Sequence, residues 1–260
     1  MDFENLILEK EDNLAILYIN RPQAMNALNA ETLYEMEAAV KDVKADSNIK
    51  VMIVTGTGDK SFVAGADINF MVSLSPAEGR FFSDLGERLM RQFELLEKPV
   101  IAAINGYALG GGCELAMSCD LRLASETAIF ALPEVGLGVI PGFGGTQRLP
   151  RLIGEGRAKE LIFTTSVIKA QEAYRIGLVN QVYPLDQLMD EAKKLAKKIA
   201  SKAPLAVGYA KFAINKGLQV DIDTAMSIES DMFGLCCATT DKTEGMGAFL
   251  EKRKPQFMGK

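Results

Sequence analysis

The sequence predicts an α/β protein with a helical C-terminal region. Short apolar runs alternate with amphipathic stretches as far as Pro184, which is typical of a chain that alternates strands and helices. After Pro184 only amphipathic stretches follow. Of the 260 residues, 48% are apolar and 24% are charged with both signs mixed, so the chain can build a sizeable core.

A hairpin and a helix are expected in the N-terminal part. Strands are expected at residues 5–9 and 14–19, and the polar Glu11-Asp12-Asn13 between them is typical of a hairpin turn. Residues 30–45 are expected to form an amphipathic helix, because apolar residues recur there at intervals of three and four. These apolar residues are Leu33, Met36, Val40 and Val43.

The later elements follow the same patterns. A helix is expected at 75–96, because Ser75-Pro76 is a favourable helix start and Lys98-Pro99 ends it. Short buried strands are expected at 50–55, 100–104, 121–124, 128–131 and 178–182. Helices are expected at 110–117, 186–202, 205–217, 222–235 and 242–252. Groups of two strands and a helix thus recur, and a glycine-rich loop spans 136–145.

The composition excludes several classes of function. The net charge is −5, so no general surface for a nucleic acid is expected. The chain contains no histidine, which excludes an imidazole base and histidine-ligated zinc or haem. Proton transfer must therefore fall to Glu, Asp, Lys, Tyr or Cys.

The four cysteines predict free thiols. Cys113 and Cys119 lie six residues apart, and Cys236 and Cys237 are adjacent, so neither pair suits a metal site. Free thiols are typical of a reducing cytosol, and a cytoplasmic protein is expected. The N-terminus lacks a signal-peptide pattern, and no apolar run reaches ~18 residues, so no membrane partner is expected.

Three glycine-rich segments could hold an anion or merely turn the chain. Residues 56–61 lack the G-x-G-x-x-G and G-K-[ST] patterns, which favours a plain turn, and residues 142–145 are interpreted as a tight turn into a helix. Residues 110–112 follow a buried strand and open a helix, whose first amides are unpaired donors with partial positive charge. Consecutive glycines let the backbone approach a ligand closely, so this turn can hold developing negative charge.

Two glutamates lie in apolar segments beside glycines. Glu114 lies in CELAM after the glycine run, and Glu134 lies in FALPEVGL. A carboxylate in an apolar run is costly unless it is partnered or functional. A structural role for Glu114 and a solvated loop position for Glu134 are the alternatives. Burial would raise both pKa values, which suits a general acid–base pair near neutral pH.

Several motifs together resemble the crotonase (enoyl-CoA hydratase) superfamily over almost the whole chain, most of all the short-chain hydratases of bacterial butyrate-type metabolism. They are Asn20-Arg21-Pro22 with Asn26-Ala27-Leu28, SFVAGADI at 61–68, KPVIAAINGYALGGGCE at 98–114, Pro133-Glu134, PGFGGTQRL at 141–149 and Glu251-Lys252-Arg253. The resemblance implies a crotonase-type spiral of ββα units with a helical C-terminal trimerisation region. A catalytic core at 1–195 and an oligomerisation region at 196–260 are expected.

The resemblance also implies a reaction. This is the reversible syn hydration of short-chain trans-2-enoyl-CoA, such as crotonyl-CoA, to 3-hydroxyacyl-CoA, with no cofactor beyond the CoA of the substrate. Glu114 and Glu134 resemble the paired hydratase carboxylates. Glu114 is expected to deprotonate the water and Glu134 to protonate the α-carbon, although the roles could be shared or exchanged. Ala66 and Gly111 resemble the oxyanion-hole residues, and Gly142 resembles the position that helps to hold the water.

Binding residues are implied in the same way. Residues 64–69 resemble the segment whose backbone wraps the CoA, which makes candidates of Ala64, Asp67, Ile68 and Asn69, and Ala24 is expected to join them. Phe249 and Lys252 resemble C-terminal helix residues that reach the CoA of a neighbouring subunit in a homotrimer or a hexamer built from two trimers. For Lys252 the alternative is a solvated helix end, where a cation suits the helix dipole.

Two positions and two competing functions stay open. Leu132 stands where many hydratases have a glutamine, which leaves the hydrogen bonding of Glu134 open. Phe143 either shapes the acyl pocket or packs in the core. Double-bond isomerases of the superfamily often keep only one of the two carboxylates, so Glu114 and Glu134 together favour a hydratase over an isomerase or another crotonase-type CoA enzyme. A non-catalytic RNA-binding protein with this fold is disfavoured by the acidic charge.

Overall fold

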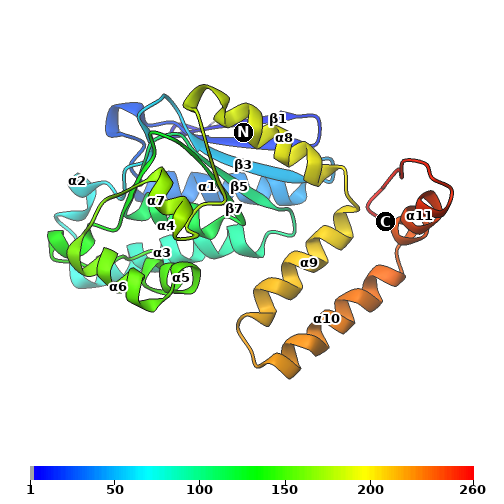
Figure 1. Ribbon diagram of the computed structural model, residues 1–260. Helices are drawn as coiled ribbons and strands as arrows, with labels where there is room; N and C mark the ends of the chain where they lie inside the picture. The colour runs from blue at the N-terminus through cyan, green and yellow to red at the C-terminus, as the bar shows by residue number, and fades with distance from the viewer. Residues whose placement is uncertain (1–2) are drawn as a thin grey trace.

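Strands and helices alternate along the first part of the chain, and the computed structural model, which describes residues 3–260, arranges them as repeated strand–strand–helix groups (Figure 1). The first group is β1 (Leu6–Glu11), β2 (Leu14–Ile19) and α1 (Ala30–Ala45). The next are β3 (Val51–Gly56), β4 (Ser61–Val63) and α3 (Pro76–Leu95), then β5 (Val100–Ile104), β6 (Tyr107–Leu109) and α4 (Gly111–Ser118), then β7 (Leu121–Ser125), β8 (Ile129–Ala131) and α5 (Gly145–Ile153).

Shorter elements connect these groups and end the body. Two 3₁₀ turns are η1 (Pro22–Ala24) and η2 (Glu134–Leu137). The remaining elements are α2 (Ile68–Met71), α6 (Glu155–Thr164), β9 (Ile168–Lys169), α7 (Ala170–Arg175), β10 (Gln181–Tyr183) and α8 (Leu185–Ala200).

The strands form two sheets. One has the order β1-β2-β3-β5-β7-β10 and the other β4-β6-β8-β9. From β3 to β8, the first strand of each group joins the larger sheet and the second joins the smaller one, with parallel pairing. Successive groups therefore stack as turns of a spiral, and the expected spiral of ββα units is confirmed.

The main helices begin where side chains cap them and bury one apolar stripe. Asn29 accepts a hydrogen bond from the Thr32 amide at the start of α1, and Ser75 and Glu78 form a capping box at the start of α3. Helix α1 buries its apolar stripe, and α3 buries Phe82, Leu85, Leu89 and Phe93. These faces line the large core between the sheets and helices.

A second core lies between the larger sheet and α8. Its helix side is formed by Leu188, Ala192 and Ala196, which pack on β2, β3, β5 and β7. The sequence places the end of the catalytic core between residues 195 and 196. Both residues lie inside α8, which packs on the larger sheet.

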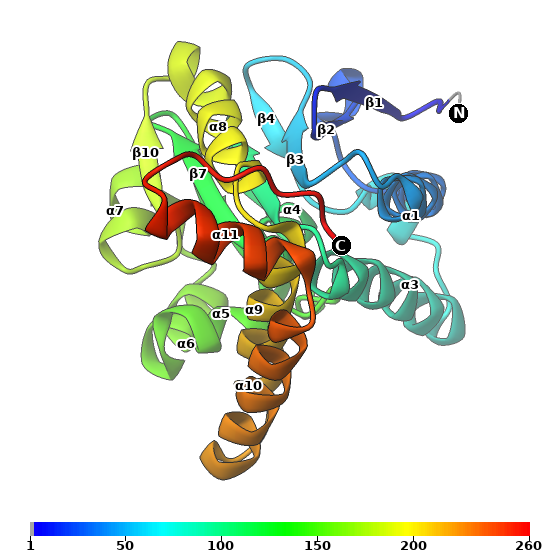
Figure 2. The same cartoon turned by 90° about the vertical axis from the view of Figure 1, so that its right-hand side faces the viewer.

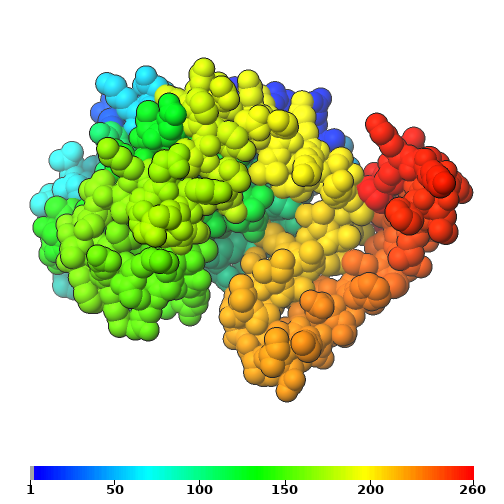
Figure 3. All heavy atoms as spheres, viewed as in Figure 1, coloured from blue at the N-terminus to red at the C-terminus, as the bar shows by residue number. Residues whose placement is uncertain are grey.

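Three helices beyond α8 leave the body. They are α9 (Pro204–Gly217), α10 (Ile222–Cys237) and α11 (Thr240–Leu250), and we refer to residues 204–260 as the C-terminal arm. Helices α9 and α10 pack against each other, and α10 extends beyond the body (Figures 1 and 2). Figure 3 shows a notch between the arm and the body.

The structure corrects three sequence predictions. The strand expected at 178–182 begins only at Gln181, because the amides of Leu178 and Val179 donate to the Ala173 carbonyl instead of a sheet neighbour. The glycine-rich loop at 136–145 is shorter than expected, since η2 extends to Leu137 and α5 begins at Gly145. Helix α11 ends at Leu250, where the prediction continued to residue 252.

Candidate active site

Helix α4 starts on a glycine run that meets the smaller sheet and the η2 turn. Gly110 has φ +48°, a conformation that favours glycine. A β-carbon on Gly112 would overlap the carbonyl oxygen of Val63 in β4, and one on Gly110 would lie 2.5 Å from Glu134 Oε1. The absence of side chains therefore brings the first turn of α4 against β4 and brings the Gly110 backbone close to Glu134.

Glu114 lies in the first turn of α4 and is 1% exposed. Its Oε1 accepts hydrogen bonds from the amides of Phe143 at 2.9 Å and Gly145 at 2.6 Å. Burial and the charge of Glu134 together raise the pKa of this carboxyl to about 7, although the two amides and Arg148 act in the opposite direction. Glu114 is therefore a carboxyl group fixed by two hydrogen bonds, and it can exchange a proton near neutral pH.

Glu134 is the first residue of η2 and its surroundings differ. Its Oε2 is buried and has no hydrogen-bond partner among residues 3–260. Burial raises the pKa of this carboxyl to about 6. The buried Leu132 is apolar and can offer it no donor. Glu134 thus presents a carboxylate oxygen that no protein donor occupies.

The two glutamates that the sequence singled out occupy one site. The Glu114 amide donates to the Gly110 carbonyl at 3.0 Å, and a β-carbon on Gly110 would lie 2.5 Å from Glu134 Oε1. Burial raises the pKa of the Cys113 thiol, which directly precedes Glu114, and the charges of Glu114 and Glu134 raise it further. Two carboxyl groups with raised pKa values in a shared site can divide the tasks of proton donor and acceptor.

Two backbone amides lie close together at the start of α4, next to the Gly110 backbone that approaches Glu134. Ala66 pairs with Leu28, whose amide donates to the Gly65 carbonyl and whose carbonyl accepts from the Asp67 amide, both at 2.8 Å. A β-carbon on Gly111 would lie 3.7 Å from the Ala66 nitrogen, so these two backbones are close. Within residues 3–260, neither the Ala66 nor the Gly111 N–H donates to a protein acceptor.

The predicted CoA-binding segment lies beside these amides. The Ala64 amide donates to the Met25 carbonyl at 3.1 Å, which brings the η1 turn and its Ala24 next to residues 64–69. Asp67 accepts from Arg21 Nη2 at 3.1 Å and caps α2 through the Asn69 amide. Ile68 and Asn69 are exposed. The structure therefore assembles Ala24, Ala64, Asp67, Ile68 and Asn69 around one exposed rim.

The loop at 141–145 covers Glu114, since the amides of Phe143 and Gly145 donate to its carboxylate. Gly142 is half-buried, and its carbonyl accepts a hydrogen bond from Ser83 Oγ at 2.5 Å. Phe143 packs edge-on against Phe82 with ring centroids 5.2 Å apart, in space left by Gly86, so it belongs to the core.

Sequence reasoning gave no role to Arg148 in this loop's motif. Its Nη1 donates to the Phe143 carbonyl at 2.7 Å, and its Nε donates to Glu94 Oε1 at 2.6 Å. The arginine therefore ties the loop to α3. The signal was a basic residue inside the PGFGGTQRL motif, but its acidic partner lies 54 residues away in the sequence.

Phe249 and Lys252 do not join the other predicted residues within one chain. Both are exposed in the C-terminal arm, on the far side of the molecule from α2 (Figure 1). Lys252 lies beyond the end of α11 with φ +56°, so it stands in a left-handed turn and not in the helix. Its neighbour Arg253 pairs with Glu244 and Glu251.

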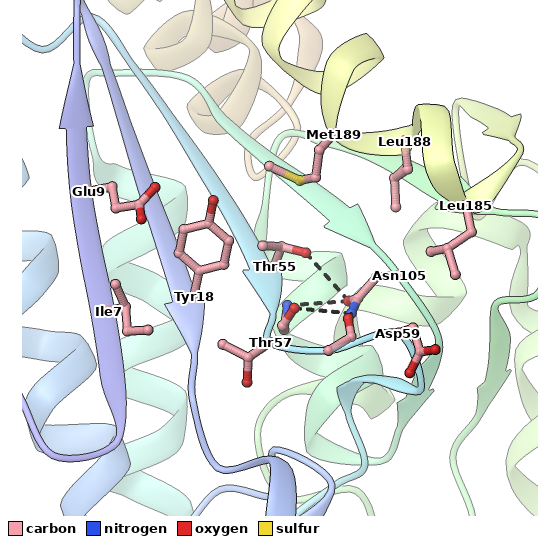
Figure 4. Close-up of a pocket in the computed structure, with 12 residues that line it drawn as sticks. Ile7, Glu9, Tyr18, Thr55, Thr57, Asp59, Asn105, Leu185, Leu188 and Met189 are labelled. Atoms are coloured by element: carbon pink, nitrogen blue, oxygen red, sulfur yellow. Dashed lines mark hydrogen bonds between the residues drawn. The ribbon is translucent and has the colours of Figure 1, made fainter.

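A separate groove of about 500 Å³ lies between the β1–β2 hairpin, the end of β3 and α8 (Figure 4). None of the predicted site residues lines it. Asn105 Nδ2 donates to the carbonyls of Gly56 and Gly58 at 3.0 and 2.8 Å, so this polar side chain shapes the turn. We assign the candidate active site to the carboxylate pair and not to this groove.

Residues 3–260 offer neither a metal site nor a membrane-spanning helix. No three His, Cys, Asp or Glu side chains within residues 3–260 gather into a set that could hold a metal ion. Among the helices of the same residues, none combines the length and the apolar character needed to cross a bilayer.

Comparison with known proteins gives one family throughout. The sequence pattern of the family "Enoyl-CoA hydratase/isomerase" matches residues 9–260. The chain is 61% identical over 260 residues to a crotonyl-CoA hydratase of Syntrophomonas wolfei, with both chains covered completely. It is 58% identical over 254 residues to a short-chain-enoyl-CoA hydratase of Clostridium acetobutylicum, covering 98% of this chain and 97% of that protein.

A solved structure shares the fold. The crystal structure of an enoyl-CoA hydratase from Bacillus anthracis superposes with a TM-score of 0.96 at 43% sequence identity. The match covers 99% of this chain and all of that one.

Proposed function

Because the chain belongs to the enoyl-CoA hydratase/isomerase family, we propose that it catalyses the reversible syn addition of water to short-chain trans-2-enoyl-CoA thioesters such as crotonyl-CoA. The product is the 3-hydroxyacyl-CoA, and dehydration uses the same groups in reverse. One observation carries the proposal: a pair of carboxyl groups with raised pKa values lies beside two backbone amides that have no protein acceptor within residues 3–260.

The two amides stabilise charge on the thioester oxygen. When the water oxygen bonds to C3, the π electrons of the C2–C3 double bond shift toward the carbonyl and an enolate forms. In our proposal the N–H groups of Ala66 and Gly111 donate to that oxygen. Loss of one such donor typically costs ~2.7–4 kcal/mol. Backbone donors need no side chain, which is why alanine and glycine suit these positions.

The two glutamates move the protons. We propose that Glu114 takes the proton of the attacking water and that Glu134 gives a proton to C2, so that the elements of water are added across the double bond. Whichever glutamate is the acid and whichever the base, the two carboxyl groups together must carry one proton before water adds. The N–H of Gly142 is proposed to help hold the water, beside the Phe143 amide that donates to Glu114.

The rim around Ala64 and Asp67 is proposed to bind the CoA part of the substrate. Its backbone is held in place by bonds to the η1 turn, and Ile68 and Asn69 are exposed at its edge. No cofactor is proposed beyond the CoA that the substrate itself carries. The four free thiols suit a reducing compartment, and we propose that the enzyme works in the cytoplasm.

We propose that the protein assembles as a homotrimer or as a hexamer of two trimers. The C-terminal arm supports this, because it exposes large apolar side chains such as Phe233 and Phe249, which are 68% and 82% exposed. In such an assembly Phe249 and Lys252 reach the CoA bound to a neighbouring subunit, which explains why they lie away from the site of their own chain.

The test is the loss of enoyl-thioester absorbance when the purified protein is mixed with crotonyl-CoA, beside a C8 or C10 enoyl-CoA. Fast loss with crotonyl-CoA and slow loss with the longer thioester is expected. If the double bond migrates and no 3-hydroxyacyl-CoA forms from either substrate, the protein is an isomerase and not a hydratase.

A further inference from the structure

The peptide group between Gly142 and Phe143 is held from both ends. Its N–H donates to Glu114 Oε1 at 2.9 Å, and its carbonyl accepts from Ser83 Oγ at 2.5 Å. The described residues contain no cis peptide bond, and a trans peptide directs its N–H and its C=O to opposite sides. Helix α3, which carries Ser83, therefore grips the side of the peptide opposite to α4, which carries Glu114.

The two amides that bind Glu114 are anchored in different ways. Gly145 is the first residue of α5, and the carbonyl of its peptide, that of Gly144, accepts from the amides of Gln147 and Arg148 at 3.0 and 2.9 Å. The first turn of α5 thus fixes that amide. The Gly142–Phe143 peptide belongs to no helix or strand, and within residues 3–260 its carbonyl is bonded to Ser83 alone.

The flanking residues make this anchor necessary. Gly142 has space around its Cα, since a β-carbon there would meet only ordinary contacts, with Ser83 Oγ at 3.6 Å and the Ile140 carbonyl at 4.0 Å. A glycine backbone without close neighbours can rotate at little cost. A peptide that rotates would turn its N–H away from Glu114, while the Phe143 ring could stay in the core.

We propose that Ser83 is a positioning residue of the hydration reaction, which orients the Gly142–Phe143 peptide so that its N–H stays on Glu114. The inference rests on the proposed function, because it assigns Ser83 to the support of one of the two reacting carboxylates. A hydroxyl that donates to the carbonyl also polarises the peptide and strengthens its N–H as a donor.

This arrangement has a measurable electrostatic consequence. The Phe143 amide favours the charged form of Glu114 and so lowers its pKa, against burial and the charge of Glu134, which raise it, while Arg148 also lowers it. If Ser83 no longer holds the peptide, one of the lowering contributions weakens. The pKa of Glu114 is then expected to rise.

The test compares three variants. Ser83→Ala removes the hydroxyl, and Ser83→Thr keeps it. Ser75→Ala is the matched control, since it removes a hydrogen-bonding serine at the start of the same helix, away from the loop. For Ser83→Ala, kcat for crotonyl-CoA is expected to fall roughly three- to tenfold, as for one lost hydrogen bond. The limb of the pH profile set by Glu114 is expected to move to higher pH.

Ser83→Thr is expected to restore both values, and Ser75→Ala to change neither. Carbon-13 NMR of labelled glutamate gives the pKa of Glu114 in the folded protein without turnover. An unchanged Glu114 pKa in Ser83→Ala would overturn the inference, even if kcat falls, because the serine would then act by another route. If the unsubstituted protein does not hydrate crotonyl-CoA, the proposed function fails, and the NMR titration still decides the role of Ser83.

Discussion

The body and the C-terminal arm treat their apolar side chains in opposite ways. In the body, helices α1 and α3 bury their apolar stripes in a core shared with both sheets. In the arm, α10 has no buried residue, and the buried residues of α9 and α11 are Lys211, Asp241 and Ala248. The body can therefore be stabilised by its own core, whereas the apolar faces of the arm need a partner surface.

The arm is nevertheless fixed to the body at a polar point. Lys211 of α9 is 9% exposed, and its Nζ donates to Asp120 Oδ2 at 2.7 Å and to the Phe93 carbonyl at 3.0 Å. Burial raises the pKa of Asp120, while Lys211 acts to lower it. A buried pair of this kind fixes a geometry more than it adds stability. It sets the direction in which α9 leaves the body and hence where the apolar faces of the arm are presented.

The sharpest test of this division removes the chemistry from the body and leaves the arm intact. Glu134→Gln is expected to lower kcat for crotonyl-CoA about 10²- to 10⁴-fold, as for loss of a general acid or base. The fold and the molecular mass should not change, because Glu134 Oε2 makes no hydrogen bond within residues 3–260.

Steady-state kinetics, circular dichroism and light scattering check these outcomes. Glu126→Gln, at an exposed turn between β7 and β8, is the control and should retain full activity. Near-normal turnover of Glu134→Gln would remove Glu134 from the mechanism.

The second test addresses the arm and leaves the carboxylates in place. Phe233→Asp puts a charge on the apolar surface of α10, where 68% of the residue is exposed in the single chain. If other subunits cover this surface, the assembled species is lost in light scattering, and KM for the CoA substrate rises because Phe249 and Lys252 no longer reach a neighbour.

Tyr34→Asp is the matched control on the body, since Tyr34 is an exposed aromatic residue of α1. It should leave the mass unchanged. A Phe233→Asp protein of unchanged mass would show that this face of α10 is not a subunit interface.

The sequence predicted the body better than the way its parts meet. Helix α1 and strand β5 form at the predicted residues, because a capped apolar stripe and a continuous apolar run are local signals. Strands β4 and β6 were missed, since each has three residues and is defined by its pairing with the other. Helix α5 follows the turn into a helix that was expected at residues 142–145, but α6, β9 and α7 were missed.

The site divides in the same way. An apolar context with adjacent glycines pointed to Glu114 and Glu134, and the structure brings both carboxylates to the Gly110 turn at the start of α4. The groups that form hydrogen bonds to this site could not be found from local sequence context. Phe143 and Gly145 lie 29 and 31 residues from Glu114, and Ser83 lies 59 residues from Gly142. A serine on a half-buried helix face has no local feature that marks it.

The smallest expected effect is a pH dependence that belongs to the body alone. The pKa values of Glu134 and Glu114 are raised to about 6 and about 7, so the pair holds one proton mainly between these values. Hydration should therefore follow a bell-shaped profile in kcat/KM, falling at lower pH as the base becomes protonated and at higher pH as the acid is lost.

Stability should respond with a definite sign. Both carboxyls have a higher pKa folded than unfolded, where glutamate titrates near 4.5, so the native state binds more protons between pH 4.5 and about 7. Their contribution to the free energy of unfolding is thus largest at acidic pH and is lost as the pH rises through this range. Glu134→Gln does not titrate, so its melting temperature relative to the unsubstituted protein should be higher at pH 8 than at pH 5. An equal difference at both pH values would mean that Glu134 titrates normally, and the acid–base pair would lose its physical basis.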